Sequence, residues 1–386
     1  MGNAKRYDLD RSKKTNMWLK FDYILMSAVV GLAVIGLVML PSAMIGYANS
    51  FSRVLMQIIC FAIGIAIAIL LSCIDYIVFK HMAIFFYIAN LFMMLLVYTP
   101  LGVSMYGAER WINLGIMTYQ PSELLKLATI IMVAVCLEDM KLDKGRTLYN
   151  ILRIGFFFVV PMGLVILQKD LGTTLVFVFF FVAMLFIAGL KLRYFLIAGA
   201  VGTAVIPFIW KFLMDDVRRN RIISFLDPES DPQGMGFQAL KAKYSIGSGQ
   251  LFGKGLGNGP MNNAGAGAVP VKEADFIFSV IGEELGFIGC VAVVILFFVL
   301  LLKAIEISRR SSDYFGEYVS IGIFAVFAFH FWENIGMNIQ IMPITGIPLP
   351  FLSAGGSALL TNFFSIGVLL SISARRKHEG YFVEEH

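Results

Sequence analysis

One acidic residue stands where a polar stretch of the chain runs into a long apolar stretch. Asp275 precedes the run FIFSVIGEELGF, and the sequence stays apolar from there to Leu302. On a helix that starts at this carboxylate, Ser279, Gly282 and Gly286 share its small, polar face. A carboxylate at a bilayer edge is energetically expensive and is therefore a candidate for function. Helix capping and close Gly-x-x-x-Gly packing would explain the same residues without chemistry.

A second pair of charged residues lies at the start of another apolar stretch. Glu123 and Lys126, in the run QPSELLK, are three residues apart, so they share one face of a helix and can form an ion pair. Such a pair inside a helix bundle can be purely structural, or it can line a cavity that receives substrate.

The composition determines the class of protein that must position these residues. Of the 386 residues, 58% are hydrophobic and only 15% are charged, with a mean hydropathy of +0.79. Soluble globular chains carry about 25% charged residues, so the chain belongs in a membrane. The net charge of +5 does not indicate nucleic acid as a partner, because the basic residues are scattered between apolar segments. The four cysteines and four histidines show no metal-ligand or disulfide spacing.

Apolar runs long enough to cross a bilayer recur along the whole chain. We therefore expect an all-α polytopic membrane protein with ten transmembrane helices. The predicted spans are Ile24–Met44, Val54–Ile74, Ala83–Tyr98, Ser122–Leu137, Ile151–Leu167, Leu171–Leu190, Phe195–Leu213, Phe276–Leu302, Tyr318–Ile339 and Ala358–Ile372.

The positions of the basic residues predict the orientation, because short cytoplasmic loops carry an excess of lysine and arginine. With ten spans both termini share one side, and most of the basic residues of the short loops fall there. We expect residues 1–20 and 375–386 to be cytoplasmic tails around a membrane domain of residues 21–374. Residues 214–274 then form a large extracytoplasmic loop between spans 7 and 8.

Two segments on the outer side are unusual for simple connections. Residues 342–357, MPITGIPLPFLSAGGS, are nearly uncharged but contain three prolines and three glycines, which predicts an irregular, re-entrant segment sheltered by protein. Within the large loop, Phe237–Ile246 can form a short amphipathic helix. The run GQLFGKG that follows lacks the spacing, the Ser or Thr and the preceding strand of a nucleotide-binding P-loop, which excludes that reading.

The motifs, taken in order, resemble one family, the SEDS proteins (shape, elongation, division and sporulation), which include RodA, FtsW and SpoVE. The resemblance covers nearly the whole chain, and its motifs are RWINLG, QPSELLK, KDLGT, FLDPESDPQGMGFQ, IGSGQLFGKGLGNG, DFIFSVIGEELGF and NIGMNIQIMPITGIPLPFLSAGGSALLTN. NIGM favours RodA, whereas GLGNG favours FtsW or SpoVE, so the subfamily stays open with a slight preference for RodA.

The resemblance implies a peptidoglycan glycosyltransferase that polymerises lipid II at the outer face of the bacterial cytoplasmic membrane, working with a class B penicillin-binding protein as transpeptidase. It places the essential carboxylate of the family on Asp275, which we expect to be the general base for an inverting displacement of undecaprenyl diphosphate. A Mg²⁺ or Mn²⁺ ion, with Asp275 as one ligand, is an alternative source of positive charge for the diphosphate. The other expected binding or cavity residues are Glu123, Lys126, Arg110, Trp111, Lys169, Asp170, Gln238, Lys243, Ser353 and Ser357.

The chain departs from the family pattern at three places near the expected site. Glu273-Ala274 replaces His-Thr before the aspartate, Lys169 replaces proline in the QPDLGT motif, and SAGGSA replaces SYGGSS. Two other functions fit the same composition: a lipid II flippase, and a scaffold that only recruits the transpeptidase. The polar residues gather near the outer face and not at the midplane, which favours the polymerase over a transporter.

Overall fold

The computed structural model describes residues 20–47, 49–105, 108–115, 117–142, 147–208, 210–211, 214, 216–231, 234–260 and 271–376. Almost all of the predicted N-terminal tail, most of the predicted C-terminal tail and residues 261–270 of the predicted outer loop lie outside these ranges.

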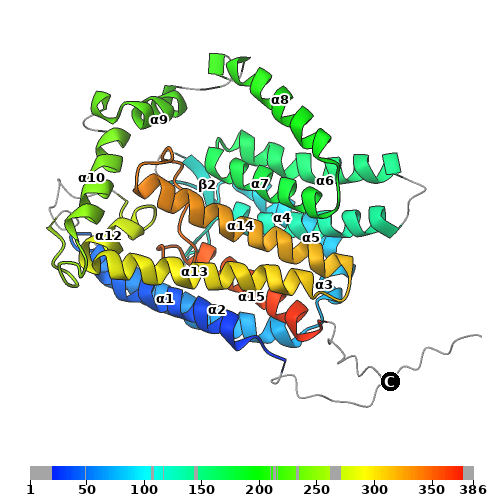
Figure 1. The fold of residues 1–386 in the computed structure, drawn as a ribbon, viewed down its shortest axis with the longest axis horizontal. Coiled ribbons are helices and arrows are strands. Elements are labelled where there is room, and N and C mark those ends of the chain that lie inside the picture. Colours follow the sequence, from blue (N-terminus) through cyan, green and yellow to red (C-terminus); the bar gives the residue numbers. More distant parts are fainter. Residues whose placement is uncertain are drawn as a thin grey trace, which may run out of the picture.

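The molecule is a bundle of long apolar helices that run roughly along its longest axis (Figure 1). The helices of the bundle are α1 (Tyr23–Ala43), α2 (Ser50–Cys73), α3 (Ile77–His81), α4 (Ala83–Leu96), α5 (Pro121–Leu142), α6 (Thr147–Leu167), α7 (Leu171–Ile187), α8 (Leu192–Phe208), α12 (Ile277–Glu284), α13 (Gly286–Arg309), α14 (Tyr314–Asn338) and α15 (Gly356–Ala374). Each predicted span overlaps one of these helices, or two of them in the case of the eighth.

Six of the helices in the described part of the chain are long and apolar enough to cross a membrane, and three shorter apolar helices accompany them. Large hydrophobic side chains on their outer faces are exposed, such as Phe85 on α4 and Leu196 on α8. A soluble protein rarely exposes so much apolar surface, whereas lipid covers it in a membrane protein. The protein is therefore a multi-pass helical membrane protein, and the total of ten crossings remains a prediction.

Local sequence explains where several helices begin. Asp22, Asp170 and Asp313 precede α1, α7 and α14, and each side chain accepts a hydrogen bond from a backbone N–H in the first turn, at 3.0, 3.1 and 2.7 Å. Such caps satisfy backbone donors that have no partner inside the helix.

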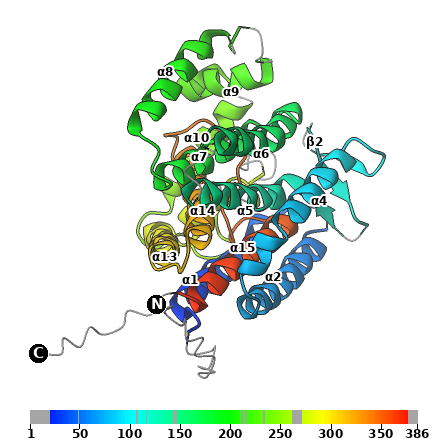
Figure 2. The ribbon, with the colours of Figure 1, turned by 90° about the vertical axis from the view of Figure 1, so that its right-hand side faces the viewer.

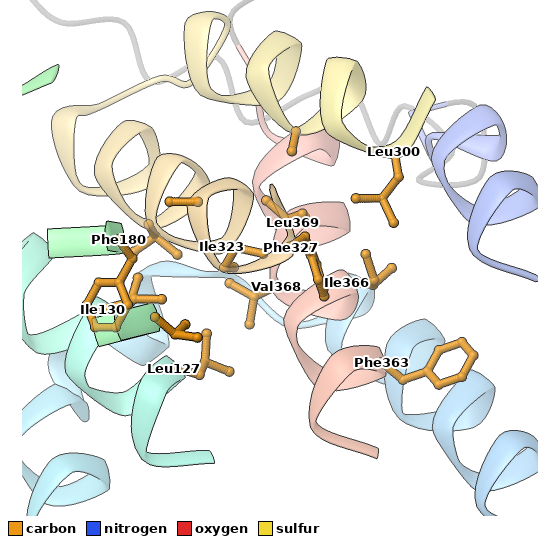
Figure 3. Packing of buried hydrophobic residues seen from close by; sticks show 14 of the residues in the cluster. Leu127, Ile130, Phe180, Leu300, Ile323, Phe327, Phe363, Ile366, Val368 and Leu369 are labelled. Carbon is orange, nitrogen blue, oxygen red and sulfur yellow. The ribbon is translucent and has the colours of Figure 1, made fainter. Parts of the chain in front are cut away.

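The core forms where α14 and α15 pack inside the ring of other helices. α15 is the most enclosed of the six long apolar helices and packs along α2, while α14 contacts α5, α7 and α13. Figure 3 shows apolar side chains from five helices meeting between them. The labelled residues are Leu127, Ile130, Phe180, Leu300, Ile323, Phe327, Phe363, Ile366, Val368 and Leu369.

A small antiparallel sheet is an exception to the all-α prediction. It consists of β1 (Gly102–Met105), β2 (Ala108–Asn113) and β3 (Thr118–Tyr119), with Ile112 paired to both Gly102 and Tyr119. Strands of two to six residues are too short to give a clear alternation in the sequence, so this part of the prediction was incomplete.

The helix expected to run without interruption from Asp275 is broken, which corrects the helical face drawn from the sequence. α12 begins at Ile277 and ends at Glu284, and α13 begins at Gly286, whose φ of +68° changes the direction of the chain between the two helices. A Cβ atom at Gly286 would lie 2.3 Å from the backbone nitrogen of Gly253. Close approach of the glycine-rich loop thus requires glycine here and ends the first helix.

The predicted outer loop contains two helices, α9 (Asp216–Leu226) and α10 (Met235–Ser248), joined through a short 3₁₀ turn (Pro228–Ser230). The predicted amphipathic helix lies within α10, which packs against α12. Figure 2 shows α8 and α9 arching away from α1, α2 and α15.

The first and last described residues lie at the same end of the bundle. There Lys303 pairs with Asp22, and the side chain of Ser312 donates to the carbonyl of Arg375. Asp275 lies at the opposite end, beside the start of α2 (Figure 1). This arrangement fits termini that share one side of a membrane.

Candidate functional site

Asp275 lies in a turn just before α12, with its backbone held on both sides. Its N–H donates to the carbonyl of Val271 at 3.1 Å. Its carbonyl accepts hydrogen bonds from the side-chain amides of Asn334 and Asn338, at 2.8 and 3.2 Å. These amides are four residues apart on α14, so one helix face fixes the position of the candidate base.

The same face of α14 also holds the irregular segment of residues 342–355. His330 contacts the carbonyl of Pro348 at 3.1 Å, and Asn334 donates to the carbonyl of Ile347 at 2.8 Å. The hydroxyl of Thr345 donates to the carboxyl of Glu333. Because this backbone forms no helix or sheet, side chains must satisfy its polar groups where water is excluded. Residues 342–355 are therefore irregular, as predicted, and side chains of α14 hold their backbone, while the re-entrant path remains a prediction.

Ser353 connects the end of this segment to the backbone just before Asp275. Its hydroxyl donates to the carbonyl of Ala274, and the N–H of Ala354 donates to the carbonyl of Glu273 at 2.8 Å. Gln57 on α2 donates to the carbonyl of Ser353 at 3.2 Å. Ser353 thus positions the turn that carries Asp275.

The surroundings of Asp275 favour the neutral form of its carboxyl group, which therefore persists to a higher pH than usual. Burial raises the pKa of Asp275 to about 7, the charges of Glu273 and Asp170 act in the same direction, and the guanidinium of Arg221 opposes them. Arg221 lies on α9 and donates to the carbonyl of Thr345 at 3.1 Å. A carboxyl with a pKa near 7 can accept a proton at physiological pH and is suited to general-base catalysis.

Glu123 and Lys126 are in contact, with 2.9 Å between the carboxylate oxygen and the ammonium nitrogen. Both side chains are buried, and the ammonium also lies 3.0 Å from Nε2 of His330. They border a small cavity of about 10 Å³ between α5, α14 and α15, room for about one water molecule. Contacts of His330 with Lys126 and with the carbonyl of Pro348 therefore connect the Glu123–Lys126 pair to the irregular segment near Asp275.

Arg110, Lys169 and Asp170 form another cluster, although they come from distant parts of the sequence. The guanidinium of Arg110 lies 3.3 Å from the carboxylate of Asp170 and donates to the carbonyl of Lys169 at 2.7 Å. Lys169 has φ +58°, a value that the proline of the family motif could not adopt. The side chain of Lys169 is exposed, whereas that of Arg110 pairs with Asp170. Next to this cluster, Gly172 packs closely against the carbonyl of Thr345.

The remaining predicted site residues have varied surroundings. Trp111 is partly buried on β2, Gln238 is partly buried on α10, and Lys243 on α10 is exposed. Ser357 is buried in the first turn of α15.

Five residues around Asp275 were absent from the sequence-based list: Arg221, His330, Glu333, Asn334 and Asn338. Four of them lie on α14, where polar side chains recur at helical spacing inside an apolar stretch. This spacing is the sequence feature from which these four residues could have been predicted. Nothing in the sequence linked Arg221 to this face.

The glycine-rich run packs against the end of α12. The N–H groups of Lys254 and Gly255 each donate at 3.0 Å to the carbonyls of Glu283 and Glu284, and the Lys254 ammonium lies 3.1 Å from the Glu283 carboxylate. The side chain of Glu284 accepts from the N–H of Gly257 at 3.1 Å. Both acids anchor the loop.

The fit of a metal ion to this site can be judged from the available ligands. Within the described ranges, no three His, Cys, Asp or Glu side chains are grouped so that they could hold a metal ion. An Mg²⁺ or Mn²⁺ ion at Asp275 would need ligands from substrate or water.

The fold and this site define a class: a multi-pass helical membrane protein with a buried polar site at one end of its bundle. The chain belongs to the FtsW/RodA/SpoVE family, described as "Cell cycle protein", whose model matches residues 23–378. The subfamily is not resolved by the relatives below.

Curated relatives carry all three family names. "Probable peptidoglycan glycosyltransferase FtsW" of Trichlorobacter lovleyi is 35% identical, covering 93% of this chain and 94% of its own. "Peptidoglycan glycosyltransferase MrdB" of Escherichia coli K12 is 35% identical over 82% and 84% of the two chains. "Stage V sporulation protein E" of Bacillus subtilis is 34% identical over 91% and 96%.

Solved structures share the fold. The rod shape determining protein RodA of Thermus thermophilus aligns with a TM-score of 0.69 and 26% identity, covering 94% of this chain and 99% of its own. A chain from a structure described as "Structural coordination of polymerization and crosslinking by a peptidoglycan synthase complex" aligns with a TM-score of 0.78 and 26% identity, over 92% and 98%.

Proposed function

We propose that this protein is a peptidoglycan glycosyltransferase that polymerises lipid II at the outer face of the bacterial cytoplasmic membrane. One observation carries the proposal: a partly buried carboxyl, Asp275, is held in place through its own backbone carbonyl and has a pKa of about 7. Family membership and the glycosyltransferase names of the relatives support the same activity.

The proposed reaction is a single inverting displacement. Asp275 takes the proton from the acceptor hydroxyl, whose oxygen attacks the anomeric carbon of the donor sugar while the bond to the diphosphate breaks. Inversion converts the α-linked sugar diphosphate into a β-linked glycan. The turn before α12 carries the proposed base at one end of the bundle, where a lipid-linked sugar would meet it at the membrane surface.

The leaving diphosphate requires positive charge. Of the cations expected from the sequence, Arg110 is engaged with Asp170, and Lys126 is engaged with Glu123. The exposed ammonium groups of Lys169 and Lys243 are therefore the better candidates for the diphosphate. A divalent ion brought with the substrate would serve the same purpose.

A class B penicillin-binding protein is the proposed partner, because a polymerase must deliver its glycan to a transpeptidase. The similarity to a chain of a peptidoglycan synthase complex supports such an assembly. The helices α9 and α10 of the predicted outer loop, the second of which packs against α12, offer surface for it (Figure 1).

The decisive experiment is polymerisation of labelled lipid II by the purified protein in detergent, with and without its transpeptidase. We expect glycan strands from the wild type and a loss of about 10²–10⁴-fold for Asp275→Asn, the usual effect of removing a general base. Asp139→Asn is the control, because Asp139 pairs with Arg153 away from the site and partly exposed.

The alternatives give different results in this assay. A flippase would produce no polymer in detergent, where no two sides of a membrane exist. A scaffold would leave the complex fully active when it carries Asp275→Asn. Either outcome would refute the proposed polymerase.

A further inference from the structure

Glu333 is a buried acid near Asp275 with only half of its carboxyl group satisfied. The residue is 2% exposed, and one carboxyl oxygen accepts the hydrogen bond of the Thr345 hydroxyl. The other oxygen, Oε2, is buried and has no hydrogen-bond partner among the residues that the structure describes.

An unpartnered buried carboxyl oxygen needs an explanation, because leaving it without a donor is costly. An ionised carboxylate only accepts hydrogen bonds, so the missing partner must be an N–H or O–H donor or a cation. The position of Glu333 indicates where this partner belongs. Glu333 lies close enough to both Asp275 and Arg221 to interact with them electrostatically.

The neighbouring backbone places Glu333 and Asp275 in one site. A Cβ atom at Gly346 would lie 3.4 Å from a carboxylate oxygen of Asp275, and the preceding residue, Thr345, binds Glu333 through its hydroxyl. The two carboxyl groups therefore meet the same short stretch of backbone from two sides.

The surroundings favour a neutral donor over a metal ion. Glu273 and Asp170 are matched by Arg53 and Arg110, and Arg221 supplies a positive charge to the two remaining acids. Little unbalanced negative charge is therefore left to attract a further cation. The described residues offer no group of three metal-ligating side chains here. Hydroxyl and amide N–H groups, which amino sugars carry in abundance, suit a carboxylate that is already partly neutralised.

We propose that Glu333 is a substrate-binding residue that accepts a hydrogen bond from a hydroxyl or acetamido N–H of the acceptor sugar, next to the hydroxyl that Asp275 deprotonates. Thr345 is then a positioning residue, because its hydroxyl turns the carboxyl of Glu333 toward the substrate. This inference rests on the proposed glycosyltransferase function and adds to it the recognition of the acceptor.

The test compares the steady-state kinetics of purified wild type and Glu333→Gln with lipid II as substrate. Glutamine keeps the shape and can still accept from Thr345, but it presents an amide donor where Oε2 would accept from the sugar. We expect the apparent KM to rise about 10- to 100-fold, as for the loss of a hydrogen bond to a charged group, with a smaller change in kcat.

Thr345 supplies a second, independent variant if Glu333→Gln does not fold. Thr345→Val keeps the shape without the hydroxyl and should also raise KM. Thr345→Ser keeps the hydroxyl and should have a KM close to that of the wild type. Glu317→Gln, at the opposite end of α14, is the matched control and should leave KM unchanged.

Three results would overturn the proposal. An unchanged KM in Glu333→Gln and Thr345→Val would exclude sugar binding by Glu333. A fall in kcat alone would instead indicate that Glu333 shares a proton with Asp275. A higher Mg²⁺ or Mn²⁺ concentration for half-maximal rate, at unchanged KM, would indicate a metal ligand. A wild type without polymerase activity would refute the proposed function instead, so the two failures are distinguishable.

Discussion

The protonation of Asp275 links the site to pH. The carboxyl has an ordinary pKa of 3.8, and burial raises it to about 7 in the folded protein. Because only the ionised form can take a proton from an acceptor hydroxyl, we expect kcat/KM for polymerisation to rise with pH and to level off above about pH 7. A pH–rate profile of the wild type measures this. A rate that is flat from pH 5 to 8 would contradict the assignment.

The same pKa shift predicts an effect on stability with a definite sign. The raised pKa means that the fold favours the protonated carboxyl, so this contribution is complete below pH 3.8 and is lost as the pH rises through about 7. Asp275→Asn, which stays neutral, should therefore have a higher melting temperature than the wild type at pH 8. The difference should shrink at pH 5. Thermal unfolding in detergent at both pH values measures it.

Glu123 and Lys126 should behave as a coupled pair. Removing one partner leaves a buried charge without its counter-ion, which typically costs about 3–5 kcal/mol, whereas removing both avoids that penalty. We expect Glu123→Gln and Lys126→Met each to be less stable than the double variant. Additive losses in a double-mutant cycle would count against direct coupling.

At the scale of elements, the polar face of α14 is what joins the separate parts of the site. Asn334 donates to the carbonyls of Asp275 and Ile347, two segments that no regular structure connects to each other. Asn90 is another buried amide, on α4, but among the residues that the structure describes its side chain donates only to the carbonyl of Phe86 in its own helix. Asn90 therefore acts within its own helix, whereas Asn334 joins two separate segments of the chain.

We expect Asn334→Leu to reduce polymerisation strongly, because it leaves the buried carbonyl of Ile347 without a donor and removes one of the two side-chain amides that hold the carbonyl of Asp275. Each unsatisfied group costs about 1–3 kcal/mol. Asn90→Leu, the matched control, should retain activity. The melting temperature shows whether a loss of activity reflects only a loss of stability. Equal activity losses in Asn334→Leu and Asn90→Leu would refute the role given to α14.

At the scale of the whole molecule, the mechanism requires Asp275 and α10 to lie outside the cytoplasm. Tyr244 on α10 and Arg309 at the end of α13 are both exposed and lie at opposite ends of the bundle. In a variant without the four native cysteines, Tyr244→Cys should react with a membrane-impermeant maleimide in sealed spheroplasts. Arg309→Cys should react only after lysis. The reverse pattern would invert the topology and remove Asp275 from its substrate.

Much of this architecture was predictable because it depends on local patterns. Apolar runs locate the helices, since about 20 such residues are needed to cross a bilayer. The three-residue spacing of Glu123 and Lys126 predicted their contact, which the structure shows at 2.9 Å. The run of prolines and glycines predicted the irregular segment before α15. The short sheet escaped prediction because its strands are too short to show a clear alternation. The break at Gly286 escaped it because the break depends on the backbone of Gly253 approaching from another part of the chain.

By itself, the sequence determined the membrane class and the places of the helices, and it predicted the two acidic positions most suited to chemistry. Only the tertiary structure decided what surrounds them. Arg110 meets Asp170, and Arg221 meets Thr345, across about 60 and 120 residues of chain. Periodicity describes which residues share a face but not which faces meet, because the packing of the whole bundle selects those contacts. The unsatisfied carboxyl oxygen of Glu333 became visible only when that packing enclosed it.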